Sequence, residues 1–328
     1  MADLRTTIGT LQLRNPVMSA SGTYGHGLES QFLASPSSVG ALVSKTVTLK
    51  PRHGNPVPRI CETEAGFLNS IGLENKGVAY YVDHILPDVR EADTLIVANI
   101  GAESIEDFVE MARLLAGREE IDAFEVNLSC PNVQDGKLPF ATDPRTASRV
   151  IEGVKRATTK PVWAKLSPNV TRIGDMARAV EEAGADAVTA VNTVLGMKVD
   201  WRTGKPGLAT VQGGYSGVAI KPIALRCAWE CARSVSIPVV GCGGIMTAED
   251  ALEFLVVGCR AVQLGTVNFS DPGLVGRVAG EMSSLLDKHG VARAADLVGT
   301  LRLPDALKPA ARPEAPAASG AACAPKGA

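Results

Sequence analysis

The sequence predicts a single (β/α)8 barrel, or TIM barrel, with a short N-terminal hairpin and long βα loops at the C-terminal face. Three observations support this fold. Eight short apolar segments alternate with segments of helical periodicity in βα order along the 328 residues. The apolar segments are mostly continuous, as parallel strands buried on both faces require. Two long connections follow predicted strands, at the end of a barrel that carries catalytic loops.

The order of the elements follows from local signals. A hairpin is expected over the first fifteen residues, turning at Gly9, and in a barrel it would cap the N-terminal mouth. The predicted strands are 16–21, 41–46, 94–100, 123–129, 161–167, 186–192, 237–241 and 260–265. The predicted helices are 75–89, 104–116, 146–157, 172–183, 220–235, 247–257 and 272–288. Start signals include Thr247 and the Asp-Pro pairs at 143 and 271, and glycines at 117, 184 and 258 provide stop signals.

Two loops and the tail complete the organisation. The connections 50–74 and 193–217 have no strong periodicity, which is typical of lids or binding loops. Residues 304–328 are rich in Ala and Pro and have no apolar period, so we expect a catalytic barrel over 1–303 and a disordered tail.

Composition excludes several classes of function. The formal net charge is −2, acidic and basic residues are interspersed, and aromatic residues make up only 4%, which argues against nucleic-acid binding. The first residues lack the apolar run of a signal peptide, and no segment approaches the roughly 20 apolar residues of a membrane span. A cytoplasmic protein is expected.

The seven cysteines, at positions 61, 130, 227, 231, 242, 259 and 323, form no CxxC pair and show no zinc or iron–sulfur spacing. We therefore expect no metal. Cys227 and Cys231 would share a helix face and are interpreted as packing, and Cys323 in the tail as incidental.

Polar residues gather where the predicted strands end. Since these ends meet at one mouth of a barrel, they would form a ring of amides, hydroxyls and amines. Each has a structural alternative, because an Asn can cap a helix and a Lys can be solvated, but the set favours a binding site. Its members are Ser21, Lys45, Thr46, Asn99, Asn127, Lys165, Asn192 and Thr193.

Glycines after the last two strands predict a phosphate site. Gly243 and Gly244 follow the seventh strand, and Gly265 with Thr266 follows the eighth, where barrels often bind phosphate through backbone N–H groups. A simple tight turn is the structural alternative. No GxGxxG motif follows a strand, so a Rossmann-type NAD site is not indicated.

The chemistry remains open on the residues alone. Cys130, on the loop after the fourth strand, is a candidate acid, base or nucleophile, although many free cysteines only pack. Two lysines at the mouth suggest a flavin, whose reduced ring carries charge that a cation stabilises. The alternative is a Schiff-base Lys165, as in barrel aldolases.

Four motifs together resemble the dihydroorotate dehydrogenases: Asn127-Leu-Ser-Cys-Pro-Asn132, Asn69-Ser-Ile-Gly-Leu-Glu-Asn75, Asn192-Thr-Val-Leu-Gly-Met197 and Gly241-x-Gly-Gly-Ile245. The cysteine is similar to that of class 1, and the run from Thr203 to Pro222 is similar to subclass 1B. The resemblance covers roughly residues 4 to 302. It implies an FMN-containing barrel that oxidises dihydroorotate to orotate in pyrimidine biosynthesis, with Cys130 as the base that takes the C5 proton.

The resemblance also implies the roles of individual residues. Substrate-binding positions are Lys45, Asn69, Ser70, Ile71, Gly72, Leu73, Asn127, Asn192 and Thr193. FMN-binding positions are Ser21, Lys45, Thr46, Asn99, Asn127, Lys165, Val191, Gly217, Gly243, Gly244, Gly265 and Thr266. Cys242 departs from the pattern and is expected only to pack. The serine base and N-terminal extension of the membrane-bound class 2 relatives are not present.

Subclass 1B implies a partner subunit that carries FAD and a 2Fe-2S cluster and passes electrons to NAD+. We expect a homodimer of this chain within a heterotetramer. The closest competing function is that of a flavin barrel similar to the dihydropyrimidine dehydrogenases, acting on uracil-type substrates. Two more distant possibilities are a cysteine-nucleophile barrel that forms a thioimidate with a purine nucleotide and a non-catalytic binding barrel.

Overall fold

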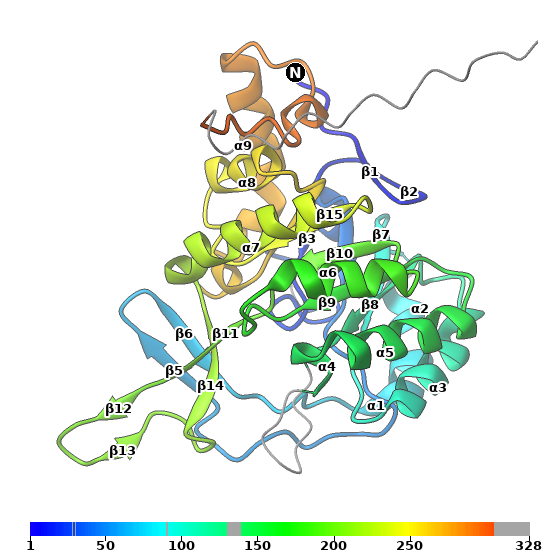
Figure 1. Cartoon of the computed structure of the whole chain (residues 1–328), viewed down its shortest axis with the longest axis vertical. Coiled ribbons are helices and arrows are strands. Elements are labelled where there is room, and N and C mark those ends of the chain that lie inside the picture. Colours follow the sequence, from blue (N-terminus) through cyan, green and yellow to red (C-terminus); the bar gives the residue numbers. More distant parts are fainter. Residues whose placement is uncertain (28, 30, 90, 130–138, 305–328) are drawn as a thin grey trace, which may run out of the picture.

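Eight parallel strands close into a barrel in the order β10-β15-β16-β3-β4-β7-β8-β9 (Figure 1). The computed structural model describes residues 1–27, 29, 31–89, 91–129 and 139–304. Each predicted strand overlaps one strand of the barrel, so the predicted fold is confirmed. The strands are β3 Val17–Ser19, β4 Ala41–Val43, β7 Leu95–Ile100, β8 Ala123–Asn127, β9 Val162–Leu166, β10 Ala187–Ala190, β15 Val239–Cys242 and β16 Ala261–Leu264.

Helices surround the barrel after seven of its strands. Among the described residues between β3 and β4, the only helix is a 3-10 turn, Pro36–Ser38. The predicted helix 75–89 is divided by a π-helical turn, Tyr81–Ile85, just before Pro87, which has no N–H to donate to the preceding turn. The α-helices are α1 Gly77–Tyr80, α2 Leu86–Val89, α3 Ile105–Ala116, α4 Pro139–Thr142, α5 Pro144–Ala157, α6 Ile173–Glu182, α7 Lys221–Ser234, α8 Ala248–Val256 and α9 Leu274–Lys288.

Two predicted start signals are confirmed as helix caps. The Asp143 carboxylate accepts hydrogen bonds from the backbone N–H groups of Arg145 and Thr146 at the start of α5. Thr247 and Asp250 form a reciprocal capping box at the start of α8. Each cap satisfies N–H groups that the helix itself leaves unpaired.

The N-terminal hairpin closes one end of the barrel. Strands β1 Thr6–Ile8 and β2 Leu11–Leu13 pair antiparallel and turn at Gly9, whose φ is 59°. Ile8 and Leu13 are buried in one apolar cluster with inward-facing barrel residues such as Trp163. The hairpin therefore caps the N-terminal mouth, as predicted.

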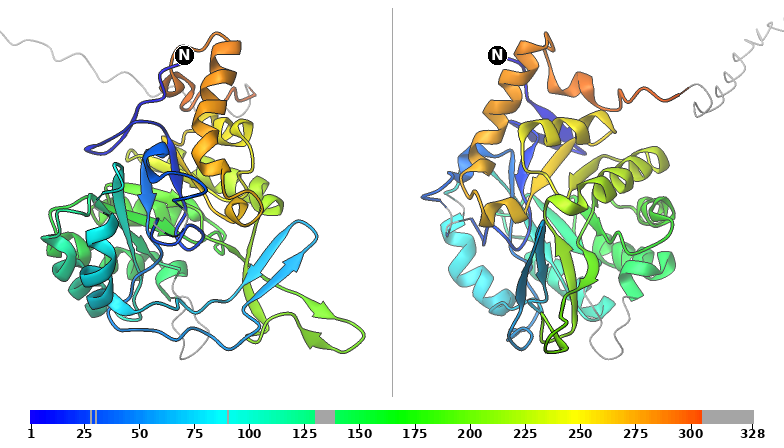
Figure 2. Two further views of the ribbon diagram at one scale, coloured as in Figure 1. Left: turned by 180° about the vertical axis from the view of Figure 1, so that it is seen from behind. Right: turned by 90° about the vertical axis from the view of Figure 1, so that its left-hand side faces the viewer.

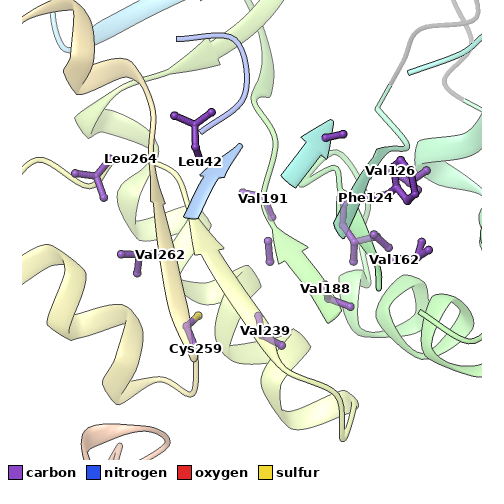
Figure 3. Close-up of a cluster of buried hydrophobic side chains, with 14 of the residues drawn as sticks. Leu42, Phe124, Val126, Val162, Val188, Val191, Val239, Cys259, Val262 and Leu264 are labelled. Atoms are coloured by element: carbon purple, nitrogen blue, oxygen red, sulfur yellow. The ribbon is translucent and has the colours of Figure 1, made fainter. Parts of the chain in front are cut away.

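A second and larger apolar cluster lies between the strands and the helices. Figure 3 shows Val188, Val239, Val262 and Leu264 on barrel strands facing the surrounding helices. Since every second residue of a strand points outward, this cluster and the one inside the barrel use alternate residues of the same strands. Burial on both faces explains why the strands are continuous apolar runs.

The two long loops contain strands that the sequence did not predict. Strands β5 Ile60–Thr63, β6 Gly66–Asn69, β14 Gln212–Ser216 and β11 Val194–Met197 form one four-stranded antiparallel sheet. A second hairpin, β12 Val199–Asp200 with β13 Lys205–Pro206, extends beyond it. Both projections lie at the end of the molecule opposite the N-terminal hairpin (Figure 2). The two loops interpreted as lids or binding loops therefore contain regular strands of their own.

Two further predictions concern membrane-spanning segments and the C-terminal tail. No helix within the described ranges is long and apolar enough to cross a membrane. Of the predicted tail, only Pro304 is described, and Cys323 lies outside the described residues. The boundary at residue 303 therefore stays a prediction.

Candidate active site

A cleft of about 1000 Å³ opens at the C-terminal ends of the barrel strands. Every predicted site residue that the structure describes lines it: Ser21, Lys45, Thr46, Asn69, Ser70, Ile71, Gly72, Leu73, Asn99, Asn127, Lys165, Val191, Asn192, Thr193, Gly217, Gly243, Gly244, Gly265 and Thr266. Cys130 lies outside the described residues. A smaller cavity of about 450 Å³ between α7, α8 and residues 298–303 contains none of them, so we place the active site in the larger cleft.

The four-stranded sheet forms one wall of the cleft and joins the two long loops. Asn69 on β6 donates a hydrogen bond from Nδ2 to the carbonyl oxygen of Gly214 on β14, at 3.2 Å. Strands approach closely here because β14 contains glycine. A Cβ atom at Gly214 would lie 2.1 Å from Thr193 Oγ1, and one at Gly66 would lie 2.0 Å from the Ser216 carbonyl oxygen. Glycine at these positions lets the wall come together.

Asn75 fixes the loop 69–73. Its Oδ1 accepts a hydrogen bond from the Gly77 N–H, at 2.8 Å, and its Nδ2 donates to Thr48 Oγ1 and to the Leu73 carbonyl oxygen, both at 2.7 Å. Asn55 Nδ2 adds a 2.8 Å bond to Ser70 Oγ. These bonds hold Leu73 at a φ of 55°, which is rare for a residue with a Cβ. Asn75 thus anchors the loop from outside the cleft, and Asn55 anchors it within the cleft wall.

Three asparagine side chains line the cleft and are fixed by hydrogen bonds. Asn192 Nδ2 donates to Asn127 Oδ1 at 3.2 Å, and Asn127 Oδ1 also accepts from the Ser129 N–H. Asn169 was not predicted, although it too lines the cleft. Its amide donates to the Thr193 carbonyl oxygen at 3.0 Å and accepts from the Leu195 N–H at 2.8 Å. Its position two residues beyond a predicted strand end was the signal in the sequence.

Lys45 brings an ammonium group to the cleft. The side chain is half-buried and lines the cleft. Among the described residues, no carboxylate forms a salt bridge with it. A partly desolvated cation of this kind favours an anionic ligand.

Lys165 differs from Lys45 because it is paired below the cleft. Its Nζ lies 3.3 Å from Glu125 Oε1 and 3.0 Å from Gln263 Oε1. Burial by itself lowers the pKa of Lys165, but the Glu125 carboxylate and Cys242 outweigh that effect, and the pKa lies above its ordinary value. Glu125 is fully buried and was not predicted as a site residue. Its only signal was a charged residue inside an apolar strand.

The predicted phosphate turn adopts a glycine conformation. Gly243 and Gly244 have φ values of 127° and 75°, which other residues rarely adopt. Within the described ranges, neither of their N–H groups donates a hydrogen bond to the protein, and both residues line the cleft. Free N–H groups at a barrel mouth suit a phosphate.

Cys242 also lines the cleft, so the expectation that it only packs is incomplete. Burial raises the pKa of its thiol, although the neighbouring Lys165 acts against the shift. The thiols of Cys227, Cys231 and Cys259 are buried in the apolar core, and that of Cys61 is half-exposed on β5. The described part of the chain contains no group of three or more His, Cys, Asp or Glu residues that could hold a metal ion.

Comparison with known proteins gives the family. The family model described as "Dihydroorotate dehydrogenase" matches residues 3–286. A relative from Bacteroides thetaiotaomicron named "Dihydroorotate dehydrogenase B (NAD(+)), catalytic subunit" is 45% identical over 303 residues, covering 92% of this chain and 100% of the relative. A relative of the same name from Geobacter sulfurreducens is 48% identical over 301 residues, covering 92% and 99%. The chain therefore belongs to the dihydroorotate dehydrogenase family.

Proposed function

We propose that this chain is the catalytic subunit of a class 1B dihydroorotate dehydrogenase, which oxidises (S)-dihydroorotate to orotate in pyrimidine biosynthesis. Family membership and the names of its relatives support the reaction. The single observation that supports the site is that all the described residues implied by the family resemblance line one cleft. We further propose that the enzyme is cytoplasmic.

The cleft fits FMN in size and in its polar groups. Unpaired N–H groups at Gly243 and Gly244 suit the phosphate, and Lys165 suits the electron-rich edge of the ring. Bound FMN would supply the acceptor for the hydride that leaves C6 of the substrate. The residues proposed to hold it are Ser21, Lys45, Thr46, Asn99, Asn127, Lys165, Val191, Gly217, Gly243, Gly244, Gly265 and Thr266.

The substrate is a flat ring edged with carbonyl and N–H groups, with one carboxylate. Asn69, Asn127, Asn192 and Thr193 offer matching amide and hydroxyl groups, and the loop 70–73, which lines the same cleft, is proposed to cover the ring. A buried polar edge left without a partner costs about 1–3 kcal/mol, so these groups favour an orotate-like ring. Lys45, which has no acidic partner within the described ranges, is proposed to bind the carboxylate.

Cys130 is proposed to remove the proton from C5. It follows Asn127, which ends β8 at the cleft, by three residues in the sequence. The buried Ser129 Oγ beside it in the chain has no hydrogen-bond partner among the described residues and lines the same cleft. A thiolate base needs a polar site that excludes bulk water, and these neighbours provide polar groups there.

Electrons are proposed to leave through a partner subunit. The names of the relatives contain "catalytic subunit" and NAD(+), which supports a second chain that delivers electrons to NAD+. We propose that this partner carries FAD and a 2Fe-2S cluster, and that two copies of each chain form a heterotetramer. The isolated chain is then expected to reduce NAD+ far more slowly than the complex. Equal rates of NAD+ reduction by the isolated chain and the complex would contradict the proposed partner subunit.

The visible spectrum of the purified chain tests the function directly. We expect a flavin spectrum that bleaches when dihydroorotate is added without oxygen. Dihydrouracil serves as the matched control, because it lacks the carboxylate that Lys45 would bind. A colourless protein that borohydride traps on a carbonyl substrate would instead support a Schiff base at Lys165, and preferential bleaching by dihydrouracil would support a function similar to that of the dihydropyrimidine dehydrogenases.

A further inference from the structure

A buried carboxylate lies directly below the cleft. Glu125, in the middle of β8, is fully buried and does not line the cleft. Its two oxygens accept four hydrogen bonds from side chains of four other barrel strands. Asn99 Nδ2 at 2.7 Å and Lys165 Nζ at 3.3 Å bind Oε1, and Thr189 Oγ1 at 2.8 Å and Gln263 Nε2 at 2.5 Å bind Oε2.

Four donors are as many as a carboxylate can readily accept, so the group is saturated within the protein. The ion pair with Lys165 does not by itself offset the cost of burying this carboxylate, because removing a carboxylate from water is expensive even beside a cation. Of its four donors, Thr189 and Gln263 do not line the cleft, whereas Asn99 and Lys165 do. The carboxylate is thus placed to act on a ligand through those two side chains.

The first route runs through Lys165. An ammonium group has three N–H donors, and two of them bind Glu125 and Gln263. The third has no acceptor among the described residues, and the side chain lines the cleft. The titratable groups near Lys165 are Glu125 and Cys242, and the Glu125 carboxylate opposes the loss of the proton that burial favours.

The second route runs through Asn99. Its Nδ2 is bound to Glu125 and its Oδ1 accepts a hydrogen bond from Thr46 Oγ1 at 2.6 Å. Thr46 Oγ1 lies 3.3 Å from Ser21 Oγ. The carboxylate therefore fixes which way the Asn99 amide points, and through it the orientation of two hydroxyl groups at the ends of β3 and β4. Four proposed FMN-binding side chains depend on one buried group.

We propose that Glu125 is the positioning residue of the flavin site, which holds Lys165 charged and directed at the cleft and fixes the Asn99–Thr46–Ser21 chain beside it. This inference rests on the proposed FMN site. Its consequence is that the charge of Glu125 sets the reduction potential of the bound flavin, because a charged Lys165 stabilises the reduced ring. The carboxylate itself touches neither flavin nor substrate.

Glu125→Gln tests the proposal, with FMN affinity and the flavin midpoint potential as readouts. The variant keeps the shape of the side chain, but it removes the counter-ion of Lys165 and turns an N–H group toward other donors. We expect FMN binding to weaken at least about tenfold and the midpoint potential to fall at neutral pH. Lys165→Met is expected to lower the potential in the same way, and the double variant to match it. An unchanged or raised potential in Glu125→Gln would overturn the proposal.

Two controls separate this role from a merely structural one. Thr189→Val removes one donor to Glu125 but keeps both charges and does not touch the cleft, so it is expected to lower the melting temperature and leave the potential unchanged. Lys165→Met replaces Glu125→Gln as the decisive variant if Glu125→Gln does not fold. Glu181→Gln removes a carboxylate that binds Ser236 and Ile237 away from the cleft, and it is expected to leave the potential unchanged. A fall in potential in Thr189→Val as large as that in Glu125→Gln, or an unchanged potential in Lys165→Met, would overturn the proposal. If the unaltered chain bound no FMN, the proposed function itself would fail.

Discussion

Gly214→Ala should separate substrate binding from FMN binding. An added Cβ would lie 2.1 Å from Thr193 Oγ1 and 2.7 Å from Thr193 Cβ, whereas ordinary contacts begin near 3.4 Å. Rotating the Thr193 hydroxyl relieves only the first contact, so β11 and β14 must move apart. Overpacking of this kind costs about 1–3 kcal/mol. If that cost falls on the substrate side, the Kd for orotate rises about 5- to 150-fold.

The assay is a titration of orotate against the absorbance of the bound flavin, with FMN affinity measured separately. We expect orotate to bind more weakly and FMN affinity to change less than threefold, because the clash lies in the wall that carries Thr193. Gly280→Ala on α9 is the matched control, since no atom lies within 4 Å of its added Cβ. Alanine there should raise stability by about 0.5–1 kcal/mol. Unchanged orotate affinity in Gly214→Ala would refute the proposed role of this wall.

Three more predictions concern the base, the loop and a helix cap. Cys130→Ala should abolish dihydroorotate oxidation and leave the flavin spectrum intact, whereas Cys61→Ala, outside the cleft, should keep turnover within twofold of the unaltered chain. Asn75→Ala removes the bonds that anchor the loop 69–73, so KM for dihydroorotate should rise at least fivefold without loss of FMN, and an unchanged KM would argue against this anchoring. Burial alone would raise the pKa of Asp250, but the hydrogen bond and charge of Lys221, together with hydrogen bonds from the Met246 and Thr247 N–H groups, outweigh it, and the folded pKa lies below the ordinary 3.8. Its stabilisation is therefore present above about pH 4 and lost as pH falls through the folded pKa, so the melting temperatures of the protein and of Asp250→Asn should converge as pH falls below about 4. A gap that stayed constant would contradict the assignment.

The barrel strands were predictable because each is a mostly apolar run that is buried on both faces. A run such as Leu95–Ile100 shows its burial directly in the sequence, and the caps at Asp143 and Thr247 mark helix starts by local chemistry. The sheet in the long loops lacked that signal. Strand β14 reads Gln-Gly-Gly-Tyr-Ser, and its pairing with β6 joins Asn69 to Gly214, which are 145 residues apart.

The site could be predicted in part because its position follows from the fold. Strand order brings the strand-end residues to one mouth, so their convergence followed from the fold. Glu125 and Asn169 were missed because their roles depend on partners distant in the sequence. Glu125 and Gln263 are 138 residues apart, and no local pattern connects them. A charged residue within an apolar strand was the one visible indication.

The barrel is closed at its N-terminal end, because Ile8 and Leu13 of the hairpin pack against the apolar side chains that fill its interior. A ligand must therefore enter and leave the cleft at the C-terminal end of the barrel, so bound orotate prevents dihydroorotate from binding. Orotate should accordingly inhibit in competition with dihydroorotate.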